Sequence, residues 1–149
     1  MIARSEGPAG GAISEPITEH VGQVYNQRFS VPFDYPVHFT RHVFAAENHT
    51  LVDAVDRLGE KRVHRAVVYL DSGLVDARPD VVREAKTYFH EHADRLELCG
   101  MPQIATGGER AKNGWEAVSD VMYTIGNLHL DRQSVVVAVG GGALLDMIG

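Results

Sequence analysis

The sequence SVVVAVGGGALLDMIG, residues 134–149, decides the fold prediction. Ser134 to Val139 is a short apolar run, typical of a strand that is covered on both faces of a sheet. Three consecutive glycines, Gly140 to Gly142, follow it, and apolar residues that begin a helix come next. Since this strand is the most apolar of the chain, we expect it to be central. Only seven residues follow the glycines, so the strand would lack a later neighbour, and we expect a truncated piece of a longer protein.

The preceding sequence alternates strand and helix patterns. Ala66 to Leu70 is a second continuous apolar run, and residues 95–105 form a weaker one. Thr50 with Asp53 resembles a capping box and begins a predicted helix that ends at Gly59. Another helix begins at Pro79; its expected inward stripe is Val81, Val82, Ala85, Tyr88 and Phe89.

Asn113 with Glu116 predicts the start of the last long helix before the glycines. Its residues at helical spacing are Trp115, Val118, Val121, Met122 and Ile125. Alternating strands and helices with short connections indicate an α/β protein. We therefore expect a Rossmann-like, mainly parallel sheet with helices on both faces, as an incomplete domain.

Residues 29–40 show a different pattern, because apolar and mostly polar residues or prolines alternate with a period of two. Pro32 and Pro36 fall on the outward side and cannot donate hydrogen bonds to a neighbouring strand. This indicates a long, proline-containing edge strand. Residues 1–27 are rich in Gly, Ser, Pro and Glu without periodicity and are predicted to be a flexible lead-in to a domain at 28–149.

The composition excludes several classes of protein. The net charge of −6 argues against nucleic acid or an anionic membrane as the main partner. No apolar run approaches the roughly 20 residues that a membrane-spanning helix needs. The first residues lack the apolar stretch of a secretory signal, and the single Cys99 rules out an internal disulfide. We expect a cytoplasmic protein.

The glycine triplet is the strongest candidate for a binding site. Glycines let a ligand approach the main chain closely, and free N–H groups at the start of a helix favour phosphate. The alternative is a tight strand-to-helix turn, but three consecutive glycines exceed what a turn requires, and we favour phosphate binding. The pattern is neither the usual dinucleotide fingerprint nor a P-loop.

Other candidate residues each have two interpretations. Asp71 ends the strand at 66–70, where it could accept ribose hydroxyls or cap a Ser-Gly turn. Asp146 could contribute to a site or merely complement the helix dipole. Glu109 and Lys112 follow Gly108. They could bind the ribose and phosphate of a nucleotide, or they could form an ion pair with each other on the surface.

The eight histidines do not form a ligand pattern. His90 and His92 are two residues apart on a predicted helix and therefore point to different faces. The sequence contains no complete metal site, nucleophile elbow or catalytic triad.

Taken in order, these motifs resemble the amino-terminal part of a sugar phosphate cyclase, the family of 3-dehydroquinate synthase and its relatives. The matching positions are Asp71, then Gly108, Glu109 and Lys112, then Gly140, Gly141, Gly142 and Asp146. Leu145 stands where dehydroquinate synthases usually have glycine, so the run is more similar to the dehydroquinate-synthase-like and sedoheptulose 7-phosphate cyclase branches.

The resemblance implies NAD as a cofactor, held by Asp71, Gly108, Glu109, Lys112, Gly141, Gly142 and Asp146. It further implies a lyase that oxidises a phosphorylated sugar transiently, eliminates phosphate and closes the ring by an aldol step. The family's divalent metal, zinc or cobalt, and its catalytic residues would lie in a carboxyl-terminal half beyond Gly149, so we expect this chain to be inactive alone. The full-length form is expected to be a homodimer.

Two alternatives remain open. Iron-type alcohol and glycerol dehydrogenases share the glycine triplet, although this chain lacks the Ala-Lys that typically follows in that family. The chain could also be a non-catalytic nucleotide-binding protein.

Overall fold

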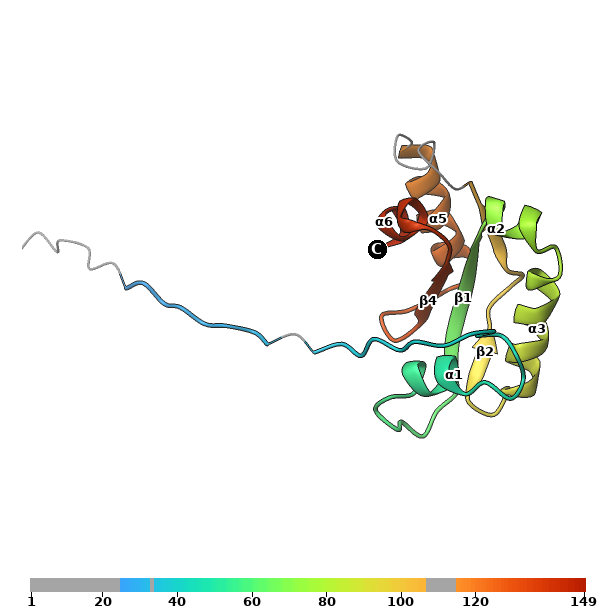
Figure 1. Cartoon of the computed structure of the whole chain (residues 1–149). Coiled ribbons are helices and arrows are strands. Elements are labelled where there is room, and N and C mark those ends of the chain that lie inside the picture. Colours follow the sequence, from blue (N-terminus) through green and yellow to red (C-terminus); the bar gives the residue numbers. More distant parts are fainter. Residues whose placement is uncertain (1–24, 33, 107–114) are drawn as a thin grey trace, which may run out of the picture. The chain divides into compact units, whose positions relative to one another are not determined.

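The computed structural model describes residues 25–32, 34–106 and 115–149. The chain divides into two units, residues 1–34 and 35–149, and all the helices and strands described lie in the second unit (Figure 1). The predicted lead-in lies outside the described residues up to residue 24, so the predicted domain boundary after residue 27 stays a prediction.

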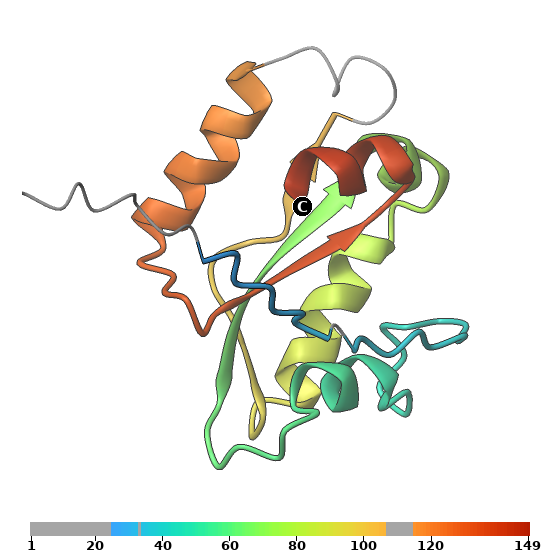
Figure 2. The same cartoon turned by 90° about the vertical axis from the view of Figure 1, so that its left-hand side faces the viewer.

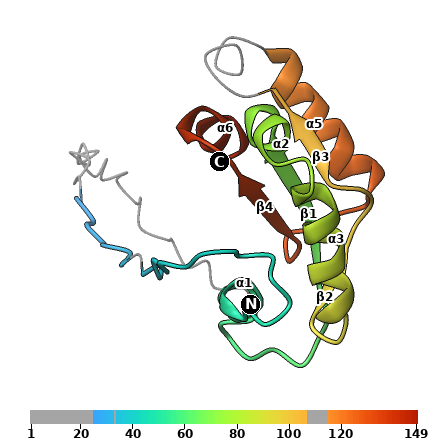
Figure 3. The ribbon, with the colours of Figure 1, turned by 45° about the vertical axis from the view of Figure 1, so that its right-hand side comes forward.

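The second unit is built around a four-stranded open sheet. Its strands are β1 (His64–Asp71), β2 (Leu96–Leu98), β3 (Gln103–Ala105) and β4 (Val135–Val139). All three strand pairings are parallel. β2 and β3 pair with successive parts of one edge of β1, and β4 pairs with the other edge (Figure 3). The predicted α/β class with a parallel sheet is confirmed.

The central strand is β1, so the prediction that residues 134–139 are central is wrong. Within the described part of the chain, β4 pairs only with β1. Residues Ala66–Leu70 are almost completely buried, whereas every residue of β4 is at least partly exposed and Val136 is 38% exposed. A high apolar content indicates a tendency to be buried, but the number of neighbouring strands decides which strand is covered.

Helices cover both faces of the sheet, as predicted. They are α1 (Thr50–Val55), α2 (Ser72–Ala77), α3 (Val81–Glu91), α5 (Trp115–Asn127) and α6 (Gly142–Ile148). Because side chains alternate along β1, Ala66, Val68 and Leu70 pack against α1 and α3, whereas Val67 and Tyr69 pack against α5 and α6. None of the helices in the described residues is long and apolar enough to cross a membrane.

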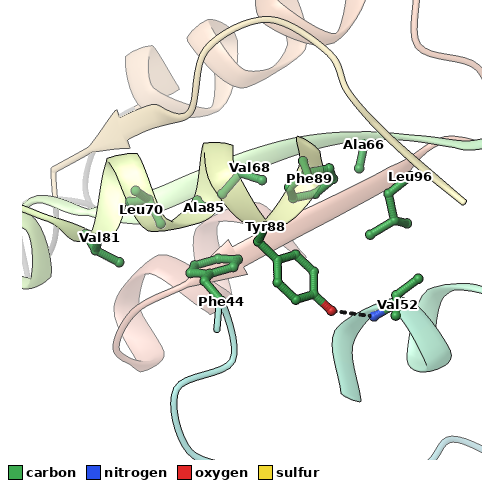
Figure 4. Close-up of a cluster of buried hydrophobic side chains, with 10 residues drawn as sticks. All are labelled: Phe44, Val52, Ala66, Val68, Leu70, Val81, Ala85, Tyr88, Phe89 and Leu96. Atoms are coloured by element: carbon green, nitrogen blue, oxygen red, sulfur yellow. Dashed lines mark hydrogen bonds between the residues drawn. The ribbon is translucent and has the colours of Figure 1, made fainter. Parts of the chain in front are cut away.

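The larger core lies between β1 and α3 (Figure 4). The predicted inward stripe is largely confirmed, because Val81, Ala85, Tyr88 and Phe89 are all buried, whereas Val82 is only partly buried against the same core. The Tyr88 hydroxyl accepts a hydrogen bond from the Val52 N–H at 3.2 Å (Figure 4) and donates one to the Asn48 carbonyl at 2.8 Å. This tyrosine therefore ties α1 to α3 in the interior.

Of the two helix starts predicted from capping boxes, one is wrong and the other lies outside the described residues. Thr50 is the first residue of α1 rather than its cap; His49 occupies the cap position, and α1 ends at Val55 instead of reaching Gly59. The Asn48 side chain accepts from the Thr50 N–H at 2.9 Å, so the asparagine two residues earlier supplies the oxygen expected from threonine. Asn113, the other predicted cap, lies outside the described residues.

The stripe predicted for α5 is only partly confirmed. Val121 is buried, but Trp115 is 79% exposed and Met122 is 63% exposed. The contact of α5 with the sheet is therefore narrower than the apolar spacing indicates.

The weak strand predicted at 95–105 consists of two short strands, β2 and β3. Gly100 between them has a φ of +76°, a left-handed conformation that ends regular pairing. Both strands still pair with β1, so the chain returns to the same edge after this turn.

The predicted edge strand at 29–40 is wrong for the residues that the structure describes, because none of them lies in a strand; Phe33 lies outside that part. Tyr35, Val37 and Phe39, on the predicted inward side, are 76%, 66% and 98% exposed. Alternation identifies a face that could be buried, but a strand also needs a neighbour with free hydrogen-bonding groups. No described strand pairs with this segment.

Candidate functional site

The candidate site lies where β1 and β4 end. Leu70 pairs with Val139, so the residues that follow them, Asp71 and Gly140, are neighbours at the carboxyl edge of the sheet. The arrowheads of β1 and β4 point to this same edge, where α2 and α6 begin (Figure 2). The carboxyl edge of a parallel sheet is the general position for ligands in open α/β proteins.

The three glycines do not serve the same purpose. A Cβ added at Gly140 would lie 2.6 Å from Asp71 Cβ and 2.8 Å from Leu144 Cδ2, so close packing alone explains this glycine. A Cβ at Gly141 or Gly142 would meet nothing within 4 Å. Neither has a positive φ, so neither packing nor backbone strain requires glycine there, although Gly141 is the N-cap of α6, a position that favours glycine over alanine. These two positions leave the main chain uncovered.

The uncovered main chain borders an open depression of about 520 Å³, lined by Asp71, Leu74, Val139, Gly140 and Gly141. The Gly141 carbonyl accepts from the N–H groups of Leu144 and Leu145. Within the described residues, the N–H groups of Gly141 and Gly142 donate to no backbone or side-chain acceptor. Gly141, which lines the depression, thus has a main-chain N–H without an acceptor in the described part of the chain.

Asp71 also lines the depression, next to Gly140. Its Oδ1 accepts a hydrogen bond from the Gly73 N–H at 2.8 Å, which caps α2. The turn-capping interpretation is therefore confirmed. Its Oδ2 has no hydrogen-bond partner within the described part of the chain and would lie 3.3 Å from a Cβ on Gly140. One oxygen holds the turn, and the other remains free to accept a hydrogen bond from a ligand.

The remaining predicted residues are not brought into the depression. Asp146 is exposed on α6 and does not line it. Gly108, Glu109 and Lys112 lie outside the described residues. Leu74, which does line the depression, was not predicted; a partly buried leucine in a short helix carries no chemical signal that would mark it.

Within residues 25–32, 34–106 and 115–149, no three His, Cys, Asp or Glu side chains form a group that could hold a metal ion. His64 is buried at the start of β1, at the far end of the strand from Asp71. Its Nε2 lies 3.1 Å from Asp56, which also pairs with Arg95 at 3.0 Å. The hydrogen bond from His64 and the Arg95 guanidinium hold the pKa of Asp56 below its ordinary value. This cluster joins α1 to the sheet and is structural.

Comparisons of the chain with protein-family models, with curated proteins and with solved structures find no match. Because no known protein supplies a comparison, the candidate site is defined by its geometry alone, namely by the position of Asp71 beside the glycine turn.

Proposed function

We propose that this chain binds NAD at the carboxyl edge of its sheet, as the amino-terminal part of a sugar phosphate cyclase. The observation that carries the proposal is the pairing of β1 with β4, which places the Asp71 carboxylate beside the glycine turn. These residues come from distant parts of the sequence, and together they offer a hydroxyl acceptor and uncovered main-chain donors.

The carboxylate and the glycine main chain suit different parts of a dinucleotide. The Asp71 carboxylate repels phosphate but accepts hydrogen bonds from ribose hydroxyls through Oδ2. The free N–H groups of Gly141 and Gly142 would hold the pyrophosphate oxygens, since no side chain blocks their approach. The depression therefore fits a ribose beside Asp71 and a pyrophosphate beside the glycines. When bound, NAD would supply the hydride acceptor for oxidation of a substrate hydroxyl.

The lyase class rests on the order of the motifs, from Asp71 through Glu109 and Lys112 to the triplet and Asp146. The corresponding substrate is a phosphorylated sugar that loses phosphate and closes to a carbocycle. The resemblance assigns the zinc or cobalt ligands and the phosphate-binding basic residues to sequence after Gly149.

Binding is tested by titrating NAD into the chain and measuring the heat of binding by isothermal titration calorimetry. We expect Asp71→Asn and Gly141→Ala each to weaken NAD binding by about tenfold, which corresponds to about 1.4 kcal/mol. Gly126→Ala is the matched glycine control, because a Cβ there also meets nothing within 4 Å but lies on α5. Equal NAD affinity in the wild type and both site variants would refute the assignment of the NAD site to Asp71 and the glycine turn.

The reaction class is tested by incubating the protein with NAD and either a phosphorylated sugar or a polyol. A cyclase releases inorganic phosphate from a phosphorylated sugar without net formation of NADH. Net NADH production from a glycerol-like polyol, without phosphate release, would instead identify a dehydrogenase.

A further inference from the structure

One apolar stripe of α5 is not covered by the sheet. The helix has 13 residues, and Figure 2 shows it at the outside of the second unit. Val121 is buried in the same cluster as Val67 and Tyr69 of β1. Trp115 and Met122, by contrast, are 79% and 63% exposed. The proposed function does not involve these two side chains.

The exposed residues belong to a regular pattern. Four apolar residues of α5 follow one another at intervals of three, four and three positions, namely Trp115, Val118, Met122 and Ile125. This is the spacing of the a and d positions of a coiled coil, which form a narrow seam that one facing helix covers. We call these four residues the α5 seam. Val118 and Ile125 are partly buried, so the seam runs along the border between the covered and the open side of the helix. The spacing indicates a second helix as the partner.

The charges beside the seam favour α5 of a second copy in the antiparallel direction. Glu116 and Asp120 are exposed and make the amino-terminal half of α5 acidic. Arg132 is exposed in the turn that follows the carboxyl end of the helix. In an antiparallel pair, the acidic half of each helix lies toward Arg132 of the other copy, and the two helix dipoles attract each other. A parallel pair would place the two acidic halves side by side, where they repel each other.

We propose that this chain forms a symmetric dimer in which the α5 seam packs antiparallel against the same seam of a second copy. Two-fold symmetry then places Trp115 against Ile125 of the second copy, and Val118 against its Met122. The helix is already formed on the sheet, so pairing does not require the entropy loss of helix formation. A helix of 13 residues is only about 20 Å long. The interface is therefore small, and the dimer exchanges with the monomer.

Trp115 is the only tryptophan of the chain, so its fluorescence reports directly on the seam. We expect its emission maximum to move to shorter wavelength as the protein concentration rises from micromolar to millimolar, because dimerisation removes the indole from water. Analytical ultracentrifugation over the same range should show a monomer–dimer equilibrium. Met122→Glu should weaken dimerisation by at least about tenfold, because symmetry places the new charge in the interface twice. Met101→Glu is the matched control, since Met101 is 55% exposed and lies outside α5.

Charge reversal tests the direction of the pairing. Glu116→Arg brings like charges together and should weaken the dimer, and adding Arg132→Glu to that variant should restore it. The proposal is overturned if the chain stays monomeric at millimolar concentration, if Met122→Glu and Met101→Glu weaken the dimer equally, or if the double charge reversal fails to rescue it. These measurements are made without NAD, so their outcome is independent of the proposed function.

Discussion

Replacing Gly140 and Gly141 by alanine, one at a time, separates packing from ligand binding at the glycine turn. At Gly140 the new methyl group would lie 2.6 Å from Asp71 Cβ and 2.8 Å from Leu144 Cδ2. Neither neighbour can yield easily, because Asp71 Cβ is fixed at the end of β1 and Leu144 is fully buried. Overpacking of this kind costs about 1–3 kcal/mol.

The expected result for Gly141→Ala is the opposite. Its methyl group would meet nothing within 4 Å, and its backbone has a φ of −77°, which alanine adopts without strain. The unfolded chain would lose conformational freedom, but alanine is a poorer N-cap than glycine, so the free energy of unfolding should change by less than about 1 kcal/mol in either direction. In contrast, NAD binding should weaken by about tenfold, because the methyl group covers the main chain that the pyrophosphate approaches.

Thermal unfolding followed by circular dichroism measures the first effect. For a chain of this size we expect the melting temperature of Gly140→Ala to fall by about 2–12 °C, from about 2–4 °C per kcal/mol. Calorimetric titration with NAD measures the second effect in Gly141→Ala. Equal destabilisation by both substitutions, or an unchanged melting temperature in Gly140→Ala, would refute the division of roles between the two glycines.

Two further predictions concern stability. Tyr88→Phe leaves the buried Val52 N–H without its acceptor, so the free energy of unfolding should fall by about 1–3 kcal/mol in urea titrations; no loss would show that water replaces the hydroxyl. His64 and Arg95 lower the pKa of Asp56 in the folded state. The ionised Asp56 therefore stabilises the fold at every pH above its unfolded pKa of about 3.9, and this stabilisation is lost as the pH falls through the lower folded-state pKa. Urea midpoints of the wild type and Asp56→Asn should therefore differ most above pH 4 and converge below it, whereas a constant difference would contradict the assignment.

Local patterns were sufficient for the elements with strong periodicity. The continuous apolar run Ala66–Leu70 predicts a strand buried on both faces, and β1 is that strand. The spacing of Val81, Ala85, Tyr88 and Phe89 predicts the buried face of α3. In each case the signal lies within one element, because burial on both faces or on one helical stripe imposes its own period on the residues.

Three predictions that depended on a neighbouring element failed. The alternation at 29–40 has the period of a strand, yet none of the described residues pairs with it. Trp115 and Met122 have helical spacing but are exposed, because α5 contacts the sheet over a narrower stripe. Apolar content favoured β4 as the centre of the sheet, but only the pairing reveals that β1 has neighbours on both edges.

The sequence by itself determined that this chain is an α/β protein with a glycine turn after an apolar strand, because periodicity and glycine content are properties of short segments. It also marked Asp71, but left open whether the carboxylate caps a turn or serves a ligand. Only the tertiary structure decided that one oxygen caps α2 while the other is free, and that Gly140 is required for packing whereas Gly141 is not. Those distinctions arise from the parallel pairing of β1 with β4, a long-range contact that no local pattern encodes.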